Sequence, residues 1–443
     1  MARPDLLDGD IRPTLLRMTI PMMMGIVSLM LFNLADLYFV SRLGTDALAA
    51  LGFSFPVCFT VISLAIGLGI GTSATLAKLL GSGNKDAAAS LASDNLLAIG
   101  FLIVLISLLM QQFIEPVFKV MGAGDNLLPY IRSYMQIWLF GSVFLVVNMV
   151  CNACMRATGD TKTPALMMAG SSLLNFILDP LLIFGAGSFE GMGIRGAATA
   201  SVIAWSLTTV VALYILLFKK CLLQIQPFHL DRLINHFRAV MKIGLPAALS
   251  NMMTPVAQGV LTFIVAKHGP EAVAAFGVGN RIESLSLLVC LALSMTLPPF
   301  ISQNFGAGKI ERVRLAYRLV SRFSIFWQML VFLVLILVSS QVAQLFSDKE
   351  GVQSLIILWI FIVPAGFAFQ AVTFLTASSF NALHQPMRAM RISIMRLFMF
   401  SLPIAWLGSE FAGLEGMFVG LVIANLCVAC LAWIAMKRYL ESL

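Results

Sequence analysis

The sequence has 443 residues, of which 59% are hydrophobic and only 11% are charged. Soluble domains average roughly 45–50% apolar and about 25% charged residues, so this composition excludes an ordinary soluble protein and indicates an integral membrane protein. The formal net charge of +8 fits either nucleic-acid binding or membrane topology, and the placement of the basic residues favours topology.

Uncharged apolar runs of about 17–25 residues, the length that crosses a bilayer as a helix, recur throughout the chain. Lipid cannot satisfy the open edges of a sheet, so these runs are predicted to be helices. The first half is expected to contain spans at residues 15–40, 51–77, 95–114, 133–155, 163–184 and 196–218. The second half is expected to contain them at residues 243–266, 276–304, 319–343, 355–380, 392–408 and 414–436.

The two halves repeat one another at a constant offset of 225 positions. Residues 43–52 (LGTDALAALG) align with residues 268–277 (HGPEAVAAFG), and Pro21 aligns with Pro246. In a membrane protein, such a duplication is typical of transporters built from two lobes. We therefore expect three parts: an N-lobe of residues 1–218, a cytoplasmic linker of residues 219–241 and a C-lobe of residues 242–443.

The basic residues predict the orientation of the chain in the membrane. With the N-terminus inside, 22 of the 29 Lys and Arg residues fall in segments that face the cytoplasm, as the positive-inside rule requires. We expect a multi-pass protein of the plasma (inner) membrane with both termini in the cytoplasm. The expected fold is all-α, with twelve transmembrane helices in two six-helix bundles related by a pseudo-twofold axis along the membrane normal.

Two acidic residues lie within predicted spans of the first half, Asp36 and Asp179. An ionisable group there costs about 2.5–3.5 kcal/mol on insertion scales and is by default a functional candidate. At 1.5 Å per residue, both carboxylates lie about 6–8 Å below the outer edge. Asn33 and Asn175 lie one turn deeper on the same faces, which predicts a polar chamber that binds and releases a proton. The alternative is a pair of interfacial acids, with Asp36 paired to Arg42 and Asp179 capping a helix.

The second half of the repeat does not keep these acids, because Asp36 aligns with Leu261. The acid well inside a second-half span is Glu283, for which a functional role and a structural ion pair with Arg281 both stay open. Coupling chemistry is therefore expected in the first lobe alone. Pro21, fifteen residues before Asp36, removes a backbone hydrogen bond and permits either a static kink or a hinge.

Residues 67–71 (GLGIG) lie inside the second predicted span. We interpret these glycines as a site of close helix packing and not as a nucleotide-binding loop. The sequence contains no phosphate-binding Walker motif, so ATP is not the expected energy source.

Several motifs resemble those of the multidrug and toxic compound extrusion (MATE) transporters, and the resemblance covers essentially the whole chain. It rests on the twofold repeat of six helices and on four segments: Asp36 with residues 40–44 (VSRLG), residues 156–162 (RATGDTK), Asn175-x-x-x-Asp179-Pro180, and Gly191 with residues 196–198 (GAA).

The resemblance to the DinF-like branch implies a first-lobe polar network. Its implied members are Asp36, Asn175 and Asp179, with Asn152 and Ser201 as further members. Pro21 corresponds to the proline about which the first helix is proposed to bend in that branch. The branch has a tyrosine one turn before the first aspartate, and this chain has Phe32 instead.

The NorM-like branch implies acidic cation ligands on the seventh and tenth helices. Here the seventh span offers none, and the tenth has Gln370 and Thr373, so a second-lobe sodium site is not expected.

The expected function is a cation-coupled, and first of all proton-coupled, antiporter that exports organic cations, drugs or toxic compounds and contributes to antibiotic resistance. A sodium-coupled MATE exporter and a lipid-linked oligosaccharide flippase are the alternatives. A membrane enzyme or passive channel is disfavoured, because no nucleophile paired with a base and no pore ring is evident. The expected partners are a small-molecule substrate, a proton or sodium ion and the bilayer. We expect no cofactor, no metal site and no nucleic-acid partner, and a monomeric chain.

Overall fold

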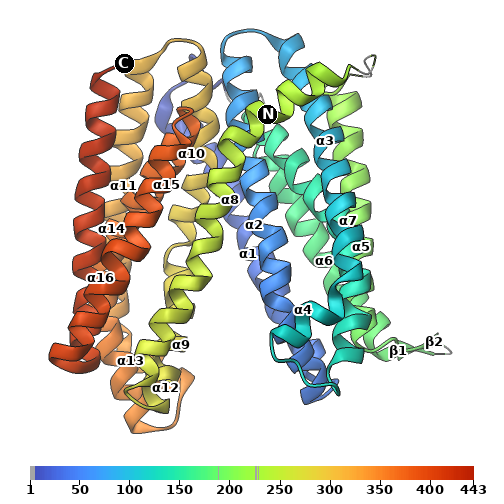
Figure 1. Cartoon of the computed structure of the whole chain (residues 1–443). Helices are drawn as coiled ribbons and strands as arrows, with labels where there is room; N and C mark the ends of the chain where they lie inside the picture. The colour runs from blue at the N-terminus through green and yellow to red at the C-terminus, as the bar shows by residue number, and fades with distance from the viewer. Residues whose placement is uncertain (1–4, 188, 225–226, 228) are drawn as a thin grey trace. The chain divides into compact units, whose positions relative to one another are not determined.

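Helices make up most of the chain (Figure 1). The computed structural model describes residues 5–187, 189–224, 227 and 229–443. In lipid a helix satisfies its backbone amides and carbonyls within one segment, so long apolar runs fold this way. The first half contains α1 (Ile11–Ser41), α2 (Thr45–Gly81), α3 (Lys85–Gln112), α4 (Ile114–Val120), α5 (Leu128–Ala157), α6 (Lys162–Phe184), α7 (Ile194–Tyr214) and η1 (Ile215–Lys219).

The second half contains α8 (Leu230–Ala266), α9 (Pro270–Ser286), α10 (Leu288–Gly306), α11 (Ile310–Leu337), α12 (Ser339–Phe346), α13 (Glu350–Ile362), η2 (Val363–Gly366), α14 (Phe367–Ala382), α15 (Pro386–Ile394), η3 (Met395–Ser401) and α16 (Leu402–Glu441). A short antiparallel hairpin of β1 (Gly185–Ala186) and β2 (Phe189–Glu190) joins α6 to α7. This hairpin is not among the elements expected from the sequence.

Among the described residues, eleven helical stretches are long and apolar enough to cross a membrane. The last, Pro386–Glu441, has 56 residues, or about 84 Å of helix, which far exceeds a hydrocarbon core of about 30 Å. The backbone leaves the helical conformation at Ala412 and Gly413, between the predicted spans 392–408 and 414–436. This stretch therefore supplies two spans, and the predicted all-α membrane fold with twelve spans is confirmed.

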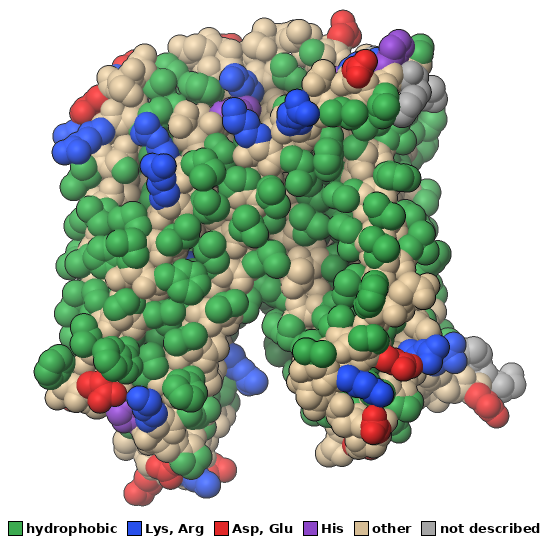
Figure 2. Space-filling model, in the orientation of Figure 1, with side chains coloured by type: hydrophobic (Ala, Val, Ile, Leu, Met, Phe, Trp, Pro, Cys, Tyr) green, Lys and Arg blue, Asp and Glu red, His purple; other side chains and the backbone are tan. Residues whose placement is uncertain are grey.

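Charged side chains gather toward the ends of the helices, and hydrophobic side chains cover their middle portions on the visible face (Figure 2). Leu29, Phe101, Leu108, Phe263 and Phe326 are among the large hydrophobic residues that are exposed. Such broad apolar exposure is unusual for a soluble protein. It is the surface that a helix presents to lipid.

The chain divides into two compact units, one mainly of Leu16–Ala248 and one of Leu6–Leu15 with Leu249–Leu443. The division therefore falls inside α8 and not within the expected linker, residues 219–241, of which the part from Leu230 onward is helical. In the second unit, Asn304 Nδ2 donates a hydrogen bond to the carbonyl of Leu6 (2.9 Å). This bond ties the segment before α1 to the second repeat.

Glycines explain why the first turns of α8 belong to the first unit. A Cβ atom at Gly67 would lie 2.4 Å from the carbonyl oxygen of Gly244, and one at Gly71 would lie 2.4 Å from that of Val240. Only glycine allows α2 and α8 to approach this closely. The predicted packing role of residues 67–71 is confirmed.

The repeat preserves backbone geometry as well as sequence. Gly83 and Gly308, which are equivalent at the 225 offset, have φ angles of 81° and 71°. Gly159 has φ of 83°, and the equivalent residue His384 has φ of 58° although it is not glycine. Positive φ is unfavourable for residues with a side chain. The second repeat therefore keeps the conformation of this turn although the glycine that favours it is replaced by histidine.

Candidate functional site

The predicted acids of the first unit lie on α1 and α6. Asp179 is fully buried, with 0% of its surface exposed, and Asn175 is 1% exposed. Asp36 is partly buried, and its charge acts on Asp179 electrostatically. Asp179 precedes Pro180, which cannot donate a backbone hydrogen bond to the carbonyl of Phe176 and so loosens the helix beside the acid.

A hydrogen bond connects α6 to α7 within this cluster. Asn175 Nδ2 donates to Ser201 Oγ at 3.2 Å. The two helices approach closely at their hairpin, because a Cβ atom at Gly196 would lie 2.3 Å from the carbonyl oxygen of Leu182. The glycine motif at the start of α7 therefore helps to place Ser201, one turn or so along, against α6.

Asn152 of α5 is 6% exposed and donates through Nδ2 to Asn148 Oδ1 at 2.8 Å. No hydrogen bond within the described part of the chain joins it to Asn175 or Asp179. Asn33 is exposed and is likewise without a hydrogen bond to these two residues. The structure therefore groups Asp36, Asn175, Asp179 and Ser201 more closely than it groups Asn33 with them.

The cluster contains more hydrogen-bond acceptors than the protein satisfies. Among the described residues, both carboxylate oxygens of Asp179 and the Oδ1 atoms of Asp36, Asn175 and Asn152 are buried without a donor. Buried polar atoms are normally hydrogen-bonded, and leaving one unsatisfied costs about 1–3 kcal/mol. An excess of oxygen acceptors, two of them on acids, suits the binding of a proton or another cation.

The structure contradicts the alternative in which Asp36 pairs with Arg42 and Asp179 caps a helix. Arg42 donates through Nη2 to the hydroxyl of Tyr38 (2.7 Å) and lies over its ring. Ion pairs between described residues do not include one from Arg42 to Asp36. Asp179 lies inside α6 rather than at its end, so it does not cap the helix.

Tyr134 of α5 is a polar neighbour that the sequence analysis missed. It is 7% exposed, and the charges of both Asp36 and Asp179 act on it. Its hydroxyl is a potential donor to the unsatisfied carboxylates. The sequence does not identify Tyr134 as a site residue, because the acids near it come from two other helices.

The turn between α5 and α6 has a structural role. Asp160 forms an ion pair with Lys220 and accepts hydrogen bonds from the amide (3.0 Å) and the hydroxyl (2.7 Å) of Thr163. Burial alone would raise the pKa of Asp160, but Lys220 and Thr163 outweigh it, and the pKa is lowered from its ordinary value. The carboxylate stays charged and fixes the start of α6, the helix that carries Asp179.

Glu283 in the second unit has a different partner from the expected one. Its carboxylate accepts a hydrogen bond from Gln370 Nε2 at 2.7 Å, and the ion pairs of the described residues do not include one with Arg281, which is exposed. The ion-pair alternative with Arg281 is therefore wrong. Gln370, the residue in place of an acid on the tenth span, is instead a hydrogen-bond partner of that glutamate.

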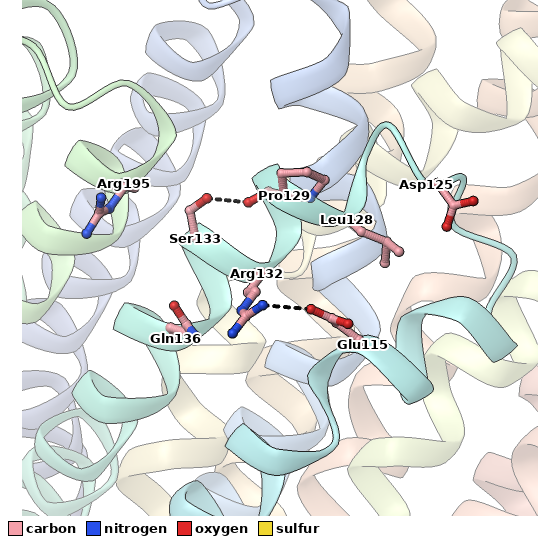
Figure 3. Close-up of a pocket in the computed structure, with 8 residues that line it drawn as sticks. All are labelled: Glu115, Asp125, Leu128, Pro129, Arg132, Ser133, Gln136 and Arg195. Carbon is pink, nitrogen blue, oxygen red and sulfur yellow. Dashed lines mark hydrogen bonds and ion pairs between the residues drawn. The ribbon is translucent and has the colours of Figure 1, made fainter.

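A surface pocket of about 410 Å³ lies in the first unit (Figure 3). Charged side chains dominate it, and Arg132 donates to Glu115 at 2.9 Å. Asp125 and Arg195 also line it. None of the predicted site residues does, so we treat it as a solvated surface at the ends of the helices.

Comparison with known proteins gives consistent matches along the chain. The MatE family model matches residues 21–181 and 246–407, so its two copies begin at the aligned residues Pro21 and Pro246. A Shewanella oneidensis protein described as a FAD transporter is 39% identical over 439 residues, 99% of this chain and 97% of that protein. The probable multidrug resistance protein NorM of Thermotoga maritima is 25% identical over 421 residues, 93% of this chain and 89% of that protein.

Solved structures show the same similarity. The Vibrio cholerae MATE transporter VcmN in the bent form is 32% identical, with 98% of this chain and 97% of that chain covered and a TM-score of 0.92.

Proposed function

The chain belongs to the MatE family of membrane transporters, and from this membership we propose that it is a proton-coupled antiporter that exports small molecules. We place it in the DinF-like branch, as a monomer in the inner membrane with both termini in the cytoplasm. The N-lobe holds the coupling site, and transport proceeds by alternating access.

The observation that carries the proposal is the pair of acids, the partly buried Asp36 and the fully buried Asp179, whose buried carboxylate oxygens have no donor among the described residues. Two carboxylates that repel one another in a low-dielectric site favour binding a shared proton, because protonation removes the repulsion. Asn175 and Ser201 hold α6 and α7 together beside the pair. A substrate that is bound more weakly by the protonated site is released when the proton arrives, and the coupling is reciprocal.

A second candidate concerns the substrate. The Shewanella oneidensis relative is described as a FAD transporter, and FAD is an anionic dinucleotide, unlike the organic cations expected from the sequence. Arg396 in the second unit is a buried cation, 8% exposed. A buried guanidinium favours an anionic substrate, so we propose flavin dinucleotides as an alternative substrate class to organic cations.

Transport by the purified chain in liposomes tests the proposal. With an acidic lumen, protons leaving the liposomes should drive uptake of the substrate, either a fluorescent organic cation or FAD, and a protonophore should abolish that uptake. Protein-free liposomes are the control. Uptake that requires a sodium gradient and ignores the pH gradient would contradict proton coupling, and the two substrates distinguish the two substrate classes.

Pro21→Ala should slow transport several-fold while changing substrate affinity little. Pro21 lies inside the continuous helix α1 and leaves the carbonyl of Arg17 without its helical donor. Alanine restores that hydrogen bond, so bending α1 costs more. Initial uptake rates and equilibrium binding of the same substrate separate the two effects. Pro56→Ala, in α2, is the matched control, and wild-type rates for Pro21→Ala would rule out a hinge.

A further inference from the structure

Arg396 is a buried cation that the proposed coupling mechanism does not use. It lies in η3, the π-helical segment Met395–Ser401 of the second unit, and is 8% exposed. An arginine remains charged in proteins and carries five N–H donors. Arginine is almost never fully buried unless it is paired. The groups around Arg396 therefore indicate its role.

The partners of Arg396 are an aromatic ring and a distant charge. Its guanidinium carbon lies 4.5 Å from the ring centroid of Phe374. Glu283 acts on it electrostatically, yet no ion pair within 4.0 Å forms between described residues at this point, and no described residue accepts a hydrogen bond from Arg396. Gln370 donates a hydrogen bond to the Glu283 carboxylate (2.7 Å). The direct partner of that acid is therefore Gln370 and not Arg396.

The guanidinium donors of Arg396 thus have no hydrogen-bond acceptor among the described residues, and the guanidinium carbon lies over the Phe374 ring. This cation–π contact attracts the guanidinium to the face of Phe374, and a planar guanidinium matches two oxygens of one phosphate in a bidentate contact. The π-helical turn that carries it is a second indication, because π-helical turns occur frequently at functional sites. Glu283 supplies a counter-charge without closing the site.

We propose that Arg396 and Phe374 form a binding site for a phosphate group in the second unit, with Glu283 as its opposing charge. The inference rests on the proposed transport function and on the flavin-dinucleotide substrate class. The phosphate belongs either to the diphosphate of such a substrate or to the headgroup of a lipid. Recognition by a charged, bidentate hydrogen bond is the same in both cases.

Binding of FAD and of riboflavin to the purified full-length chain tests this site. Riboflavin shares the flavin ring but has no phosphate. Arg396→Gln should weaken FAD binding by on the order of 10- to 100-fold, because a charge-assisted hydrogen bond is lost, and leave riboflavin binding unchanged. Arg396→Lys should recover part of the affinity, since lysine keeps the charge but not the fork. Glu283→Gln should change FAD affinity in the opposite direction, because it removes an opposing negative charge.

Arg391→Gln, at an exposed position of α15, is the matched control and should bind FAD as the unmodified chain does. Phe374→Leu keeps the guanidinium and serves where Arg396→Gln fails to fold; it should weaken FAD binding less than loss of the charge. Equal loss of FAD and riboflavin binding in folded Arg396 variants would overturn the site. A wild-type chain that transports organic cations but binds FAD no better than riboflavin would instead overturn the dinucleotide substrate class.

The lipid source is distinguished by nanodiscs with and without an anionic phospholipid. If the phosphate comes from a substrate, FAD affinity should depend on Arg396 in both membranes. Anionic lipid that co-purifies with the unmodified chain but not with Arg396→Gln, together with unchanged FAD binding, would assign the same site to a lipid headgroup. An Arg396→Gln variant with normal FAD binding and normal lipid content would refute the phosphate site altogether.

Discussion

Asp179→Asn should abolish proton-driven transport and leave a folded chain. Asp179 is fully buried in α6, and neither of its carboxylate oxygens has a donor among the described residues. Asparagine has nearly the same shape but cannot take up a proton, so the coupled cycle stops. Uptake of substrate into liposomes with an acidic lumen measures the effect, which should bring the rate down to that of protein-free liposomes.

Stability gives this substitution a second, independent readout. The unpaired carboxylate is costly to bury, so removing its charge should leave thermal stability equal or higher.

Asp36→Asn should have the same effect on transport, because the two carboxylates act on one another. Asp125→Asn, at a highly exposed carboxylate of the surface pocket, is the control that should transport normally. Full proton-driven transport by folded Asp179→Asn would exclude this residue from the coupling site.

Gly67→Leu should prevent the first unit from assembling. A Cβ atom at this position would lie 2.4 Å from the carbonyl oxygen of Gly244 and 2.6 Å from the amide nitrogen of Ala248. These are backbone atoms, so they cannot move aside as a flexible side chain would. Overpacking a core costs about 1–3 kcal/mol and occasionally more, and leucine is far larger than one methyl group.

The yield of monodisperse protein and its thermal unfolding in detergent measure this effect, and both should fall sharply. Gly52→Leu is the matched control in the same helix, because a Cβ atom there has no neighbour within 4 Å. Comparable stability of the two variants would show that α2 and α8 tolerate a wider separation than the structure indicates.

The number of spans and the duplication were determined by the sequence alone. Hydropathy and length are properties of each segment by itself, because an apolar run must be helical wherever lipid surrounds it. The sequence also identified Asp36 and Asp179 as candidates, because a charge within a span is costly and is by default functional. The glycines at residues 67–71 likewise indicated close packing before their partner helix was known.

Only the tertiary structure decided which side chains meet. Tyr134 was missed, and Arg281 was considered as the partner of Glu283 where Gln370 is, because a partner on another helix depends on how the helices are rotated against one another. The placement of α8, which joins both units, depended on its contact with Gly67. The environment of Arg396 could not be predicted from the sequence for the same reason, because its neighbours come from other helices. A charge near the end of a span indicates topology in the sequence. Only the folded unit shows that no described residue accepts a hydrogen bond from this guanidinium.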